Sequence, residues 1–173
     1  MSPRRHVLSI LVENRFGELA RIVGLFSGRG FNIDQLTASP TLDPRYSRVI
    51  LVTRGDDAII EQITKQVHKL VRVRRVHHVE EGKHLERELC LATVHAATPS
   101  AREDLERIAR LVGARVVAYA GAAFTLELTA TSLEVEHFVE LLRPLGVRDL
   151  VRSAPIALPR PLSDAEAPTS ERH

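Results

Sequence analysis

The chain has 173 residues, of which 44% are apolar and 27% are charged, and its formal net charge is only +2. This composition supports a buried core and excludes both a disordered chain and a strongly basic nucleic-acid binder. Tryptophan is absent and aromatic residues make up 4%, which also argues against a base-stacking surface. The single cysteine, Cys90, excludes an internal disulfide and is typical of a reducing cytoplasm, where we expect the protein to act.

The apolar segments are short. The longest, such as residues 7–12, have the length of a strand, so the sequence predicts no membrane span. The N-terminal residues Met-Ser-Pro-Arg-Arg-His lack the long apolar region of a secretory signal. We therefore expect neither a membrane nor a nucleic acid among the partners.

The first half of the chain alternates strand and helix patterns. Apolar residues dominate residues 7–13, as in a buried strand, and after a loop over 14–17 the spacing becomes helical from Glu18 onward. Gly28 and Gly30 are expected to end this helix in the left-handed conformation. The following segments are a strand over 31–39, a turn over 41–45, a strand over 47–53, a helix opened by Gly55 and Asp56, and a strand over 71–79.

The second half repeats that order. Its segments are a strand over 88–95, a helix that Thr98 and Pro99 begin and Gly113 ends, a hairpin of 114–119 and 123–129, a helix begun by a capping box over 131–134 and stopped at Pro144, and a strand over 146–151. The prediction is an α+β protein of two ferredoxin-like βαββαβ domains, residues 1–80 and 81–158. A proline-rich tail over 159–173 is expected to be disordered.

The loop between the first strand and the first helix is a candidate site for an amino acid. Free N–H groups at a helix N-terminus attract a carboxylate, and Gly17 would let a ligand approach the backbone. Asn14 can offer both a donor and an acceptor. The same residues also suit an ordinary strand-to-helix turn, so the loop by itself leaves both interpretations open.

Asn32 lies at the start of the second strand, between Phe31 and Ile33, and is not expected near Asn14 within one chain. In a side-by-side dimer, the loop of one chain and the helix end of the other could face each other. Asn32 would then help to line an intersubunit pocket. The alternative is an asparagine that only serves the turn.

Other candidate chemistry is weaker. His77, His78 and His84 could bind a metal, but exposed histidines without nearby carboxylates are more typical of a solvated strand edge. Cys90 lies within an apolar strand, as a buried and inert thiol does. The sequence contains no nucleophile-elbow, phosphate-loop or dinucleotide-binding motif. It therefore predicts no catalytic residues and no metal site in this chain.

Two segments resemble one family. ENRFGELARIVGLFSGRGFNI and EQITKQVHKLVRVRRV are similar to the regulatory (small) subunit of acetolactate synthase, also called acetohydroxyacid synthase, and the resemblance extends over residues 6–160. It implies an N-terminal ACT domain, a homodimer formed through that domain, and a catalytic large subunit as partner. It also implies that the large subunit carries thiamine diphosphate, Mg²⁺ and FAD, while this chain carries no cofactor.

The resemblance further implies a function. Such a subunit activates the large subunit and confers feedback inhibition, usually by valine, in valine, leucine and isoleucine biosynthesis. The effector positions of the family fall on Asn14, Gly17 and Asn32, with Glu18, Leu19 and Ile33 as near neighbours. The sequence departs from the family pattern at Phe16, Ala130 and Ala154. A free-standing ACT regulator and an autonomous enzyme are the rival classes, but neither a DNA-binding element nor a catalytic set is visible.

Overall fold

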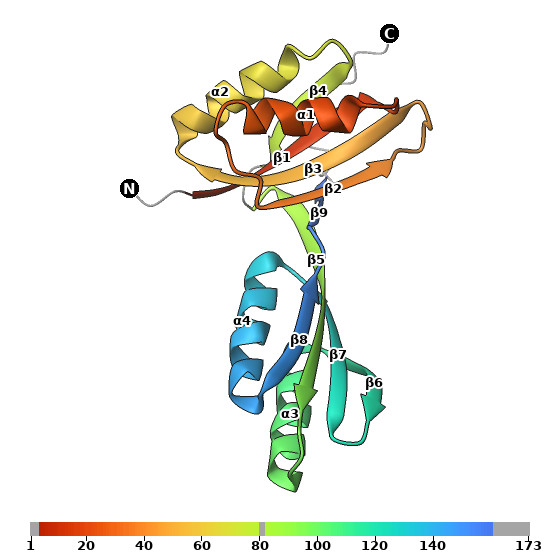
Figure 1. The fold of residues 1–173 in the computed structure, drawn as a ribbon, viewed down its shortest axis with the longest axis vertical. Coiled ribbons are helices and arrows are strands. Elements are labelled where there is room, and N and C mark those ends of the chain that lie inside the picture. The colour runs from red at the N-terminus through yellow and green to blue at the C-terminus, as the bar shows by residue number, and fades with distance from the viewer. Residues whose placement is uncertain (1–3, 80–81, 161–173) are drawn as a thin grey trace, which may run out of the picture.

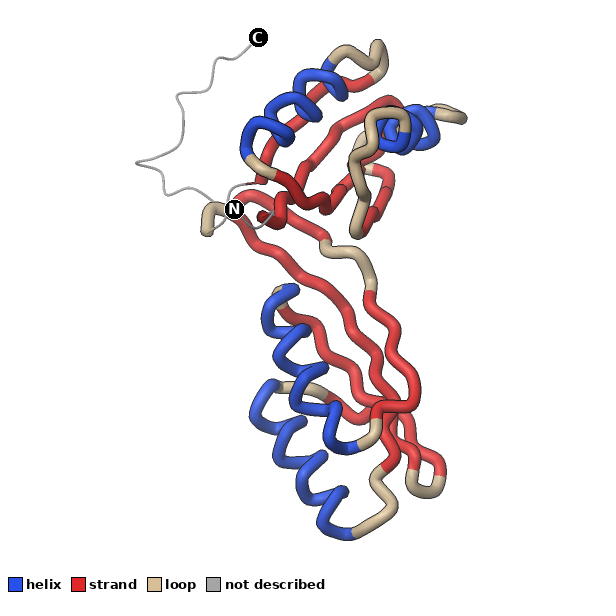
Figure 2. The backbone as a smooth tube through the Cα atoms, turned by 60° about the vertical axis from the view of Figure 1, so that its left-hand side comes forward, coloured by secondary structure: helices blue, strands red, loops and turns tan. Residues whose placement is uncertain are grey.

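The computed structural model describes residues 4–79 and 82–160, which form two βαββαβ units joined end to end (Figure 1). Each unit places two helices on one face of an antiparallel sheet (Figure 2), which confirms the predicted α+β fold. The N-terminal unit contains β1 (Arg4–Glu13), α1 (Glu18–Ser27), β2 (Gln35–Pro40), β3 (Tyr46–Gly55), α2 (Asp57–His68) and β4 (Val73–Val79). The C-terminal unit contains β5 (His84–His95), α3 (Pro99–Val112), β6 (Arg115–Ala120), β7 (Ala123–Ala130), α4 (Ser132–Leu142), a 3₁₀ turn (Arg143–Leu145) and β8 (Val147–Arg152), followed by β9 (Ile156–Pro159).

The N-terminal sheet has the strand order β2-β3-β1-β4, so β1 lies between two neighbours. Successive side chains of β1 point to opposite faces, and one set faces the helices. Asp56 caps α2 by accepting the N–H of Ile59 at 2.8 Å. The resulting core contains Leu8, Ile10 and Val12 of β1, Ile22 and Phe26 of α1, and Ile60, Ile63 and Val67 of α2.

The C-terminal sheet has the strand order β6-β7-β5-β8 and is covered on one face by α3 and α4. Both helices begin as the sequence predicts. Thr98 caps α3 with Pro99 in the first turn, and Thr131 and Glu134 form a reciprocal capping box at α4. The core beneath them includes Cys90, Leu105, Leu126, Leu128, Val135, Phe138 and Leu142.

Strand β5 joins the two units. Its first four residues, from His84 to Arg87, pair with β9, whereas its later residues pair with β7 and β8. Ala157 of β9 packs under the N-terminal sheet in a small core with Val7, Ile50 and Val52. The sequence prediction missed β9, and Pro159, which it placed in the tail, ends this strand. Residues 161–173 of the predicted tail lie outside the described residues.

Two boundaries in the N-terminal unit differ from the prediction. Gly28 has a right-handed φ of −66°, and it is Gly30, with a φ of 72°, that takes the left-handed conformation. The N–H of Phe31 donates to the carbonyl of Phe26 at 3.0 Å. Residues 28–31 therefore belong to the turn that ends the helix and not to the next strand. Strand β2 therefore begins at Gln35 and not at residue 31. Within the described ranges, every helix is too short or too polar to span a bilayer.

Candidate functional site

The loop between β1 and α1 is held by its neighbours on one side and open on the other. The backbone N–H of Asn14 donates to the carbonyl of Arg45 at 2.7 Å, and its side-chain amide donates to the carbonyl of Pro44 at 3.1 Å. Gly17, at the N-cap of α1, has a φ of 85°, which favours glycine. A Cβ added there would meet no atom of this chain within 4 Å, so the space beside the loop is open.

The first turn of α1 lies beside this space, and its first N–H, that of Glu18, donates to the carbonyl of Arg15 at 3.3 Å. Among the described residues, no side chain caps the helix, and the carbonyl of Gly17 accepts the N–H of Arg21 to start the intrahelical ladder. Leu19 keeps 40% of its surface exposed on the same turn, and Phe16 projects fully into solvent. Uncapped N–H groups and the helix dipole together favour a carboxylate, and an exposed leucine favours an apolar side chain.

Glu18 does not present its carboxylate to this space. Its side chain is buried, and one oxygen accepts hydrogen bonds from Arg21 at 3.0 Å and from Arg72 at 2.9 Å. Two guanidinium groups thus neutralise the acid next to the helix terminus. A ligand carboxylate at the first turn would therefore not meet an unpaired negative charge.

Asn32 and Ile33 lie at the opposite end of the unit from Asn14. The carbonyl of Asn32 accepts the hydroxyl of Thr53 at 2.6 Å, and Thr53 pairs with His6 near the start of β1. The ten-residue α1 separates the two positions by about 15 Å at 1.5 Å per residue. Asn14 and Asn32 therefore lie apart within one chain. The sequence had led us to expect this separation.

The surroundings of Asn32 leave it on the surface. Its side-chain amide donates to Asp34 at 2.7 Å, and Asp34 forms an ion pair with Arg54 at 2.8 Å. Ile33 packs partly against the core of the unit. One carboxylate thus orients the side-chain amide of Asn32, and the residue is exposed to solvent.

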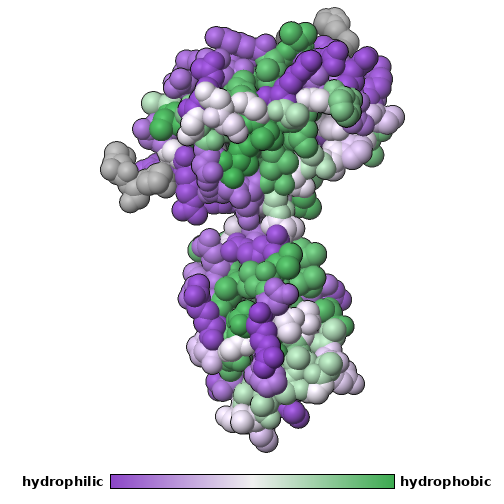
Figure 3. Space-filling model, viewed as in Figure 1, coloured by the Kyte–Doolittle hydropathy of each residue, from purple (hydrophilic) through white to green (hydrophobic). Residues whose placement is uncertain are grey.

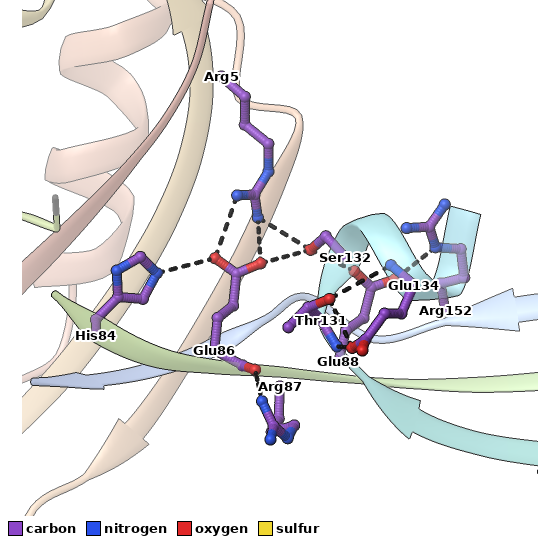
Figure 4. A network of polar contacts seen from close by, with 9 residues as sticks. All are labelled: Arg5, His84, Glu86, Arg87, Glu88, Thr131, Ser132, Glu134 and Arg152. Carbon is purple, nitrogen blue, oxygen red and sulfur yellow. Dashed lines mark hydrogen bonds and ion pairs between the residues drawn. The ribbon is translucent and has the colours of Figure 1, made fainter. Parts of the chain in front are cut away.

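A second polar site lies where the two units meet, and sequence reasoning did not find it. Figure 4 shows Glu86 of β5 between Arg5 of β1 and Ser132 of α4. Arg5 donates to the two carboxylate oxygens of Glu86 at 2.9 and 3.2 Å, and the Ser132 hydroxyl lies 2.7 Å from Glu86. Hydrophilic residues gather at the narrow waist between the units (Figure 3). This junction therefore ties the start of β1 to the start of α4.

The junction continues into the C-terminal unit. The fully buried Glu88 accepts a hydrogen bond from Arg152 of β8 and lies 2.8 Å from the Ser132 hydroxyl. Burial alone would raise the pKa of Glu86, but hydrogen bonds from Arg5, Ser132 and His84 hold that pKa below its ordinary value. Both carboxylates are thus compensated by partners from other elements, as buried charges require.

Two of the histidines predicted to be exposed are not. His78 is half-buried and lies 3.1 Å from His6, and the side chain of His84 is 12% exposed and lies 3.4 Å from Glu86. Within the described residues, no group of three or more histidine, cysteine or acidic side chains is placed to hold a metal. Cys90 is buried as predicted, and this burial raises the pKa of its thiol.

The strand orders β2-β3-β1-β4 and β6-β7-β5-β8 define two ferredoxin-like units in one chain. A family model described as the AHAS small subunit-like ACT domain matches residues 8–75, and one described as the small subunit of acetolactate synthase matches residues 87–161. The chain belongs to the acetolactate synthase small subunit family.

Individual relatives agree along nearly the whole chain. A probable acetolactate synthase small subunit of Methanothermobacter thermautotrophicus is 39% identical and covers 92% of this chain and 95% of its own length. The acetolactate synthase small subunit of Haemophilus influenzae is 41% identical, with coverages of 90% and 96%. The crystal structure of the small subunit from Thermotoga maritima superimposes with a TM-score of 0.81 at 30% identity, covering 92% and 99% of the two chains.

Proposed function

We propose that this chain is the non-catalytic regulatory subunit of an acetolactate synthase. It raises the turnover of a large catalytic subunit and makes that subunit sensitive to feedback inhibition by valine or another branched-chain amino acid. The large subunit carries thiamine diphosphate, Mg²⁺ and FAD and performs the condensation of 2-oxo acids in the cytoplasm. The naming of the relatives as small subunits supports a large partner.

The observation that carries the effector site is the open, uncapped first turn of α1. The carboxylate of a free amino acid accepts from its N–H groups beside Gly17, where a Cβ would intrude on the ligand. Oxygen atoms of the loop accept from the ammonium group, and Leu19 contacts the aliphatic side chain. Because Arg21 and Arg72 neutralise Glu18, the positive end of the helix keeps its attraction for the carboxylate.

The effector site also draws on a second copy of the chain. Strand β2 is an edge strand with one unpaired side, and antiparallel pairing of two such edges about a twofold axis places the two α1 helices antiparallel. The loop of one chain then lies beside the partner subunit's Asn32. This arrangement accounts for two groups of site residues about 15 Å apart in one chain.

Reconstitution tests this function. The purified chain, mixed with its cognate large subunit, is expected to raise the rate of acetolactate formation from pyruvate, and valine is expected to lower that rate again. The chain alone is expected to form no acetolactate. Acetolactate formation by the chain alone, or a large subunit whose turnover and valine response do not change on mixing, would refute the proposal.

A further inference from the structure

A recess under the N-terminal sheet gathers basic side chains, and none of the described residues that line it is acidic. It has a volume of about 290 Å³ and lies on the sheet face opposite the helices. Its floor comes from β1, β3 and β4, and one wall comes from the start of β5 and from β9. The lining residues are Ser9, Leu11, Arg48, Arg75, His77, Val79, Lys83, His84, Ala157 and Pro159.

The strand register explains why the cations meet there. Leu11 of β1 pairs with Arg48 of β3 on one side and with Arg75 of β4 on the other. Three neighbouring strands span about 10 Å between the outer two, so both guanidinium groups flank one apolar side chain. His77 pairs with Ser9 one step along the same face. Three basic residues thus surround one small area of the sheet.

The two arginines and the histidine have no side-chain partner within the described ranges. In the part of the chain that the structure describes, the side chains of Arg48, Arg75 and His77 form no hydrogen bond or ion pair. Two acids of the described residues near the strands that form the recess are engaged elsewhere, because Glu86 holds Arg5 and Glu13 holds Arg74 and Arg15. Within the described residues, the hollow thus holds two arginines, Arg48 and Arg75, whose guanidinium groups have no ion-pair partner.

We propose that this recess binds a small anion carrying two or more negative charges, such as a phosphate ester or a dicarboxylate. Guanidinium groups bind both kinds of group through paired N–H donors. Two arginines on either side of one strand suit an anion with more than one negative charge. The recess is too small for a protein segment but has the size of small-ligand sites. Its apolar floor and wall would contact the uncharged part of the ligand.

The location gives the ligand a consequence for the whole chain. Arg48 and Arg75 belong to the N-terminal unit. Ala157 and Pro159 belong to β9, which pairs with the start of β5. An anion in the recess would contact both and hold them together. This inference does not depend on the proposed valine site, which lies at α1 on the opposite face of the sheet.

Calorimetric titration of the full chain tests the site, with inorganic pyrophosphate and succinate as probes and acetate as the singly charged control. We expect at least one of the two probes to bind more tightly than acetate at equal ionic strength and to raise the melting temperature. The tighter probe distinguishes a phosphate ligand from a dicarboxylate ligand. Added salt should weaken the binding, because it screens exposed charges.

Variants locate the binding. Arg48→Gln with Arg75→Gln should lower the probe affinity at least roughly tenfold, because charge-assisted hydrogen bonds are lost. Arg148→Gln, which removes an exposed and unpaired arginine of β8, should leave it unchanged. Equal losses in both variants, or no binding of either probe at millimolar concentration, would overturn the proposal. A double variant that binds the probes normally but fails to join the large subunit would show a protein interface instead.

Discussion

Gly17 is the residue on which the proposed effector site depends most. Its φ of 85° is costly for residues with a Cβ, by about 1–2 kcal/mol, although asparagine and aspartate tolerate this region better than most. The sequence identified the glycine by its place in a strand-to-helix loop. Only the structure shows why glycine is needed there. The positive φ of the backbone favours glycine, whereas a Cβ would contact no other atom of this chain within 4 Å.

Gly17→Asp should abolish valine inhibition of the reconstituted complex while leaving activation intact. The added carboxylate would occupy the ligand space and repel the valine carboxylate at the N–H groups of α1. Gly17→Asn is the matched control, because it brings a side chain of similar size and backbone strain without the charge. We expect the inhibition constant of the aspartate variant to exceed that of the asparagine variant by roughly tenfold or more, about 1.4 kcal/mol.

Inhibition curves for the two variants and the wild-type chain supply the measurement. If folded Gly17→Asp retains the wild-type curve, the effector binds elsewhere. If the two variants weaken inhibition equally, backbone strain and steric overlap, and not charge, explain the loss.

Ser132 connects three charged residues at the junction of the two units. Its hydroxyl lies within 3.0 Å of atoms from Arg5, Glu86 and Glu88, and a hydroxyl carries a single hydrogen, so it donates to one carboxylate at a time. Each of these contacts joins positions more than forty residues apart in sequence, as their separations of 127, 46 and 44 show. Periodicity and local motifs therefore could not reveal the junction.

Ser132→Ala should destabilise the chain by about 1–3 kcal/mol, because two buried carboxylates lose a partner. Ser100→Ala is the control, since Ser100 is also in the first turn of a helix of the same unit but is exposed and unbonded. Its effect should stay within about 0.5 kcal/mol. Denaturant unfolding of both variants measures the difference, and equal midpoints would contradict the structural role of the junction.

At the scale of elements, the sequence was most informative where the periodicity is strong. The helices of both units and the capping residues Asp56, Thr98 and Thr131 are where the pattern predicts them. Strand β9 was missed because its four residues, the last of which is Pro159, carry too short an alternation to be distinguished from a tail. The early start of β5 was missed because charged residues alternate there, and their burial depends on Arg5 and Ser132.

The proposed dimer forms through the edge strand β2. Thr41 donates inward to Tyr46 at 3.0 Å, so by alternation the N–H groups of Leu36 and Ala38 point away from β3. Ala38→Pro would remove one outward donor without breaking the ladder to β3, since edge strands tolerate proline on the side that faces away. We expect this variant to shift from dimer to monomer and to lose valine binding.

Light scattering at micromolar concentration measures that shift, with Ala38→Thr as the control because it keeps the N–H group. Monomeric wild-type chain in the presence and absence of valine would contradict the dimer. A dimeric Ala38→Pro variant would mean that the two chains associate through another edge.

At the scale of the whole molecule, two strands run from the junction in opposite directions, one into each unit. Strand β1 leads from Arg5 at the junction to Glu13, next to the loop of the proposed effector site, and β5 leads from the junction into the core of the C-terminal unit. In the proposed function, an effector at the loop would be connected to the second unit through β1, whose Arg5 bonds to Glu86 and Ser132 and whose Val7 packs near Ala157. The family and the fold could be predicted from the sequence, but this connection could not.

The central claim is that each effector site is shared by two chains, and mixed dimers test it most directly. Gly17→Asp and Asn32→Ala each damage both sites of their own homodimer. Random assembly on co-expression gives about half mixed dimers, each with one doubly altered site and one intact site, so about a quarter of all sites are wild type. Calorimetric titration with valine should therefore recover tight binding at about that fraction. If the mixture binds no more valine tightly than the two homodimers do separately, the site lies within a single chain and the account is wrong.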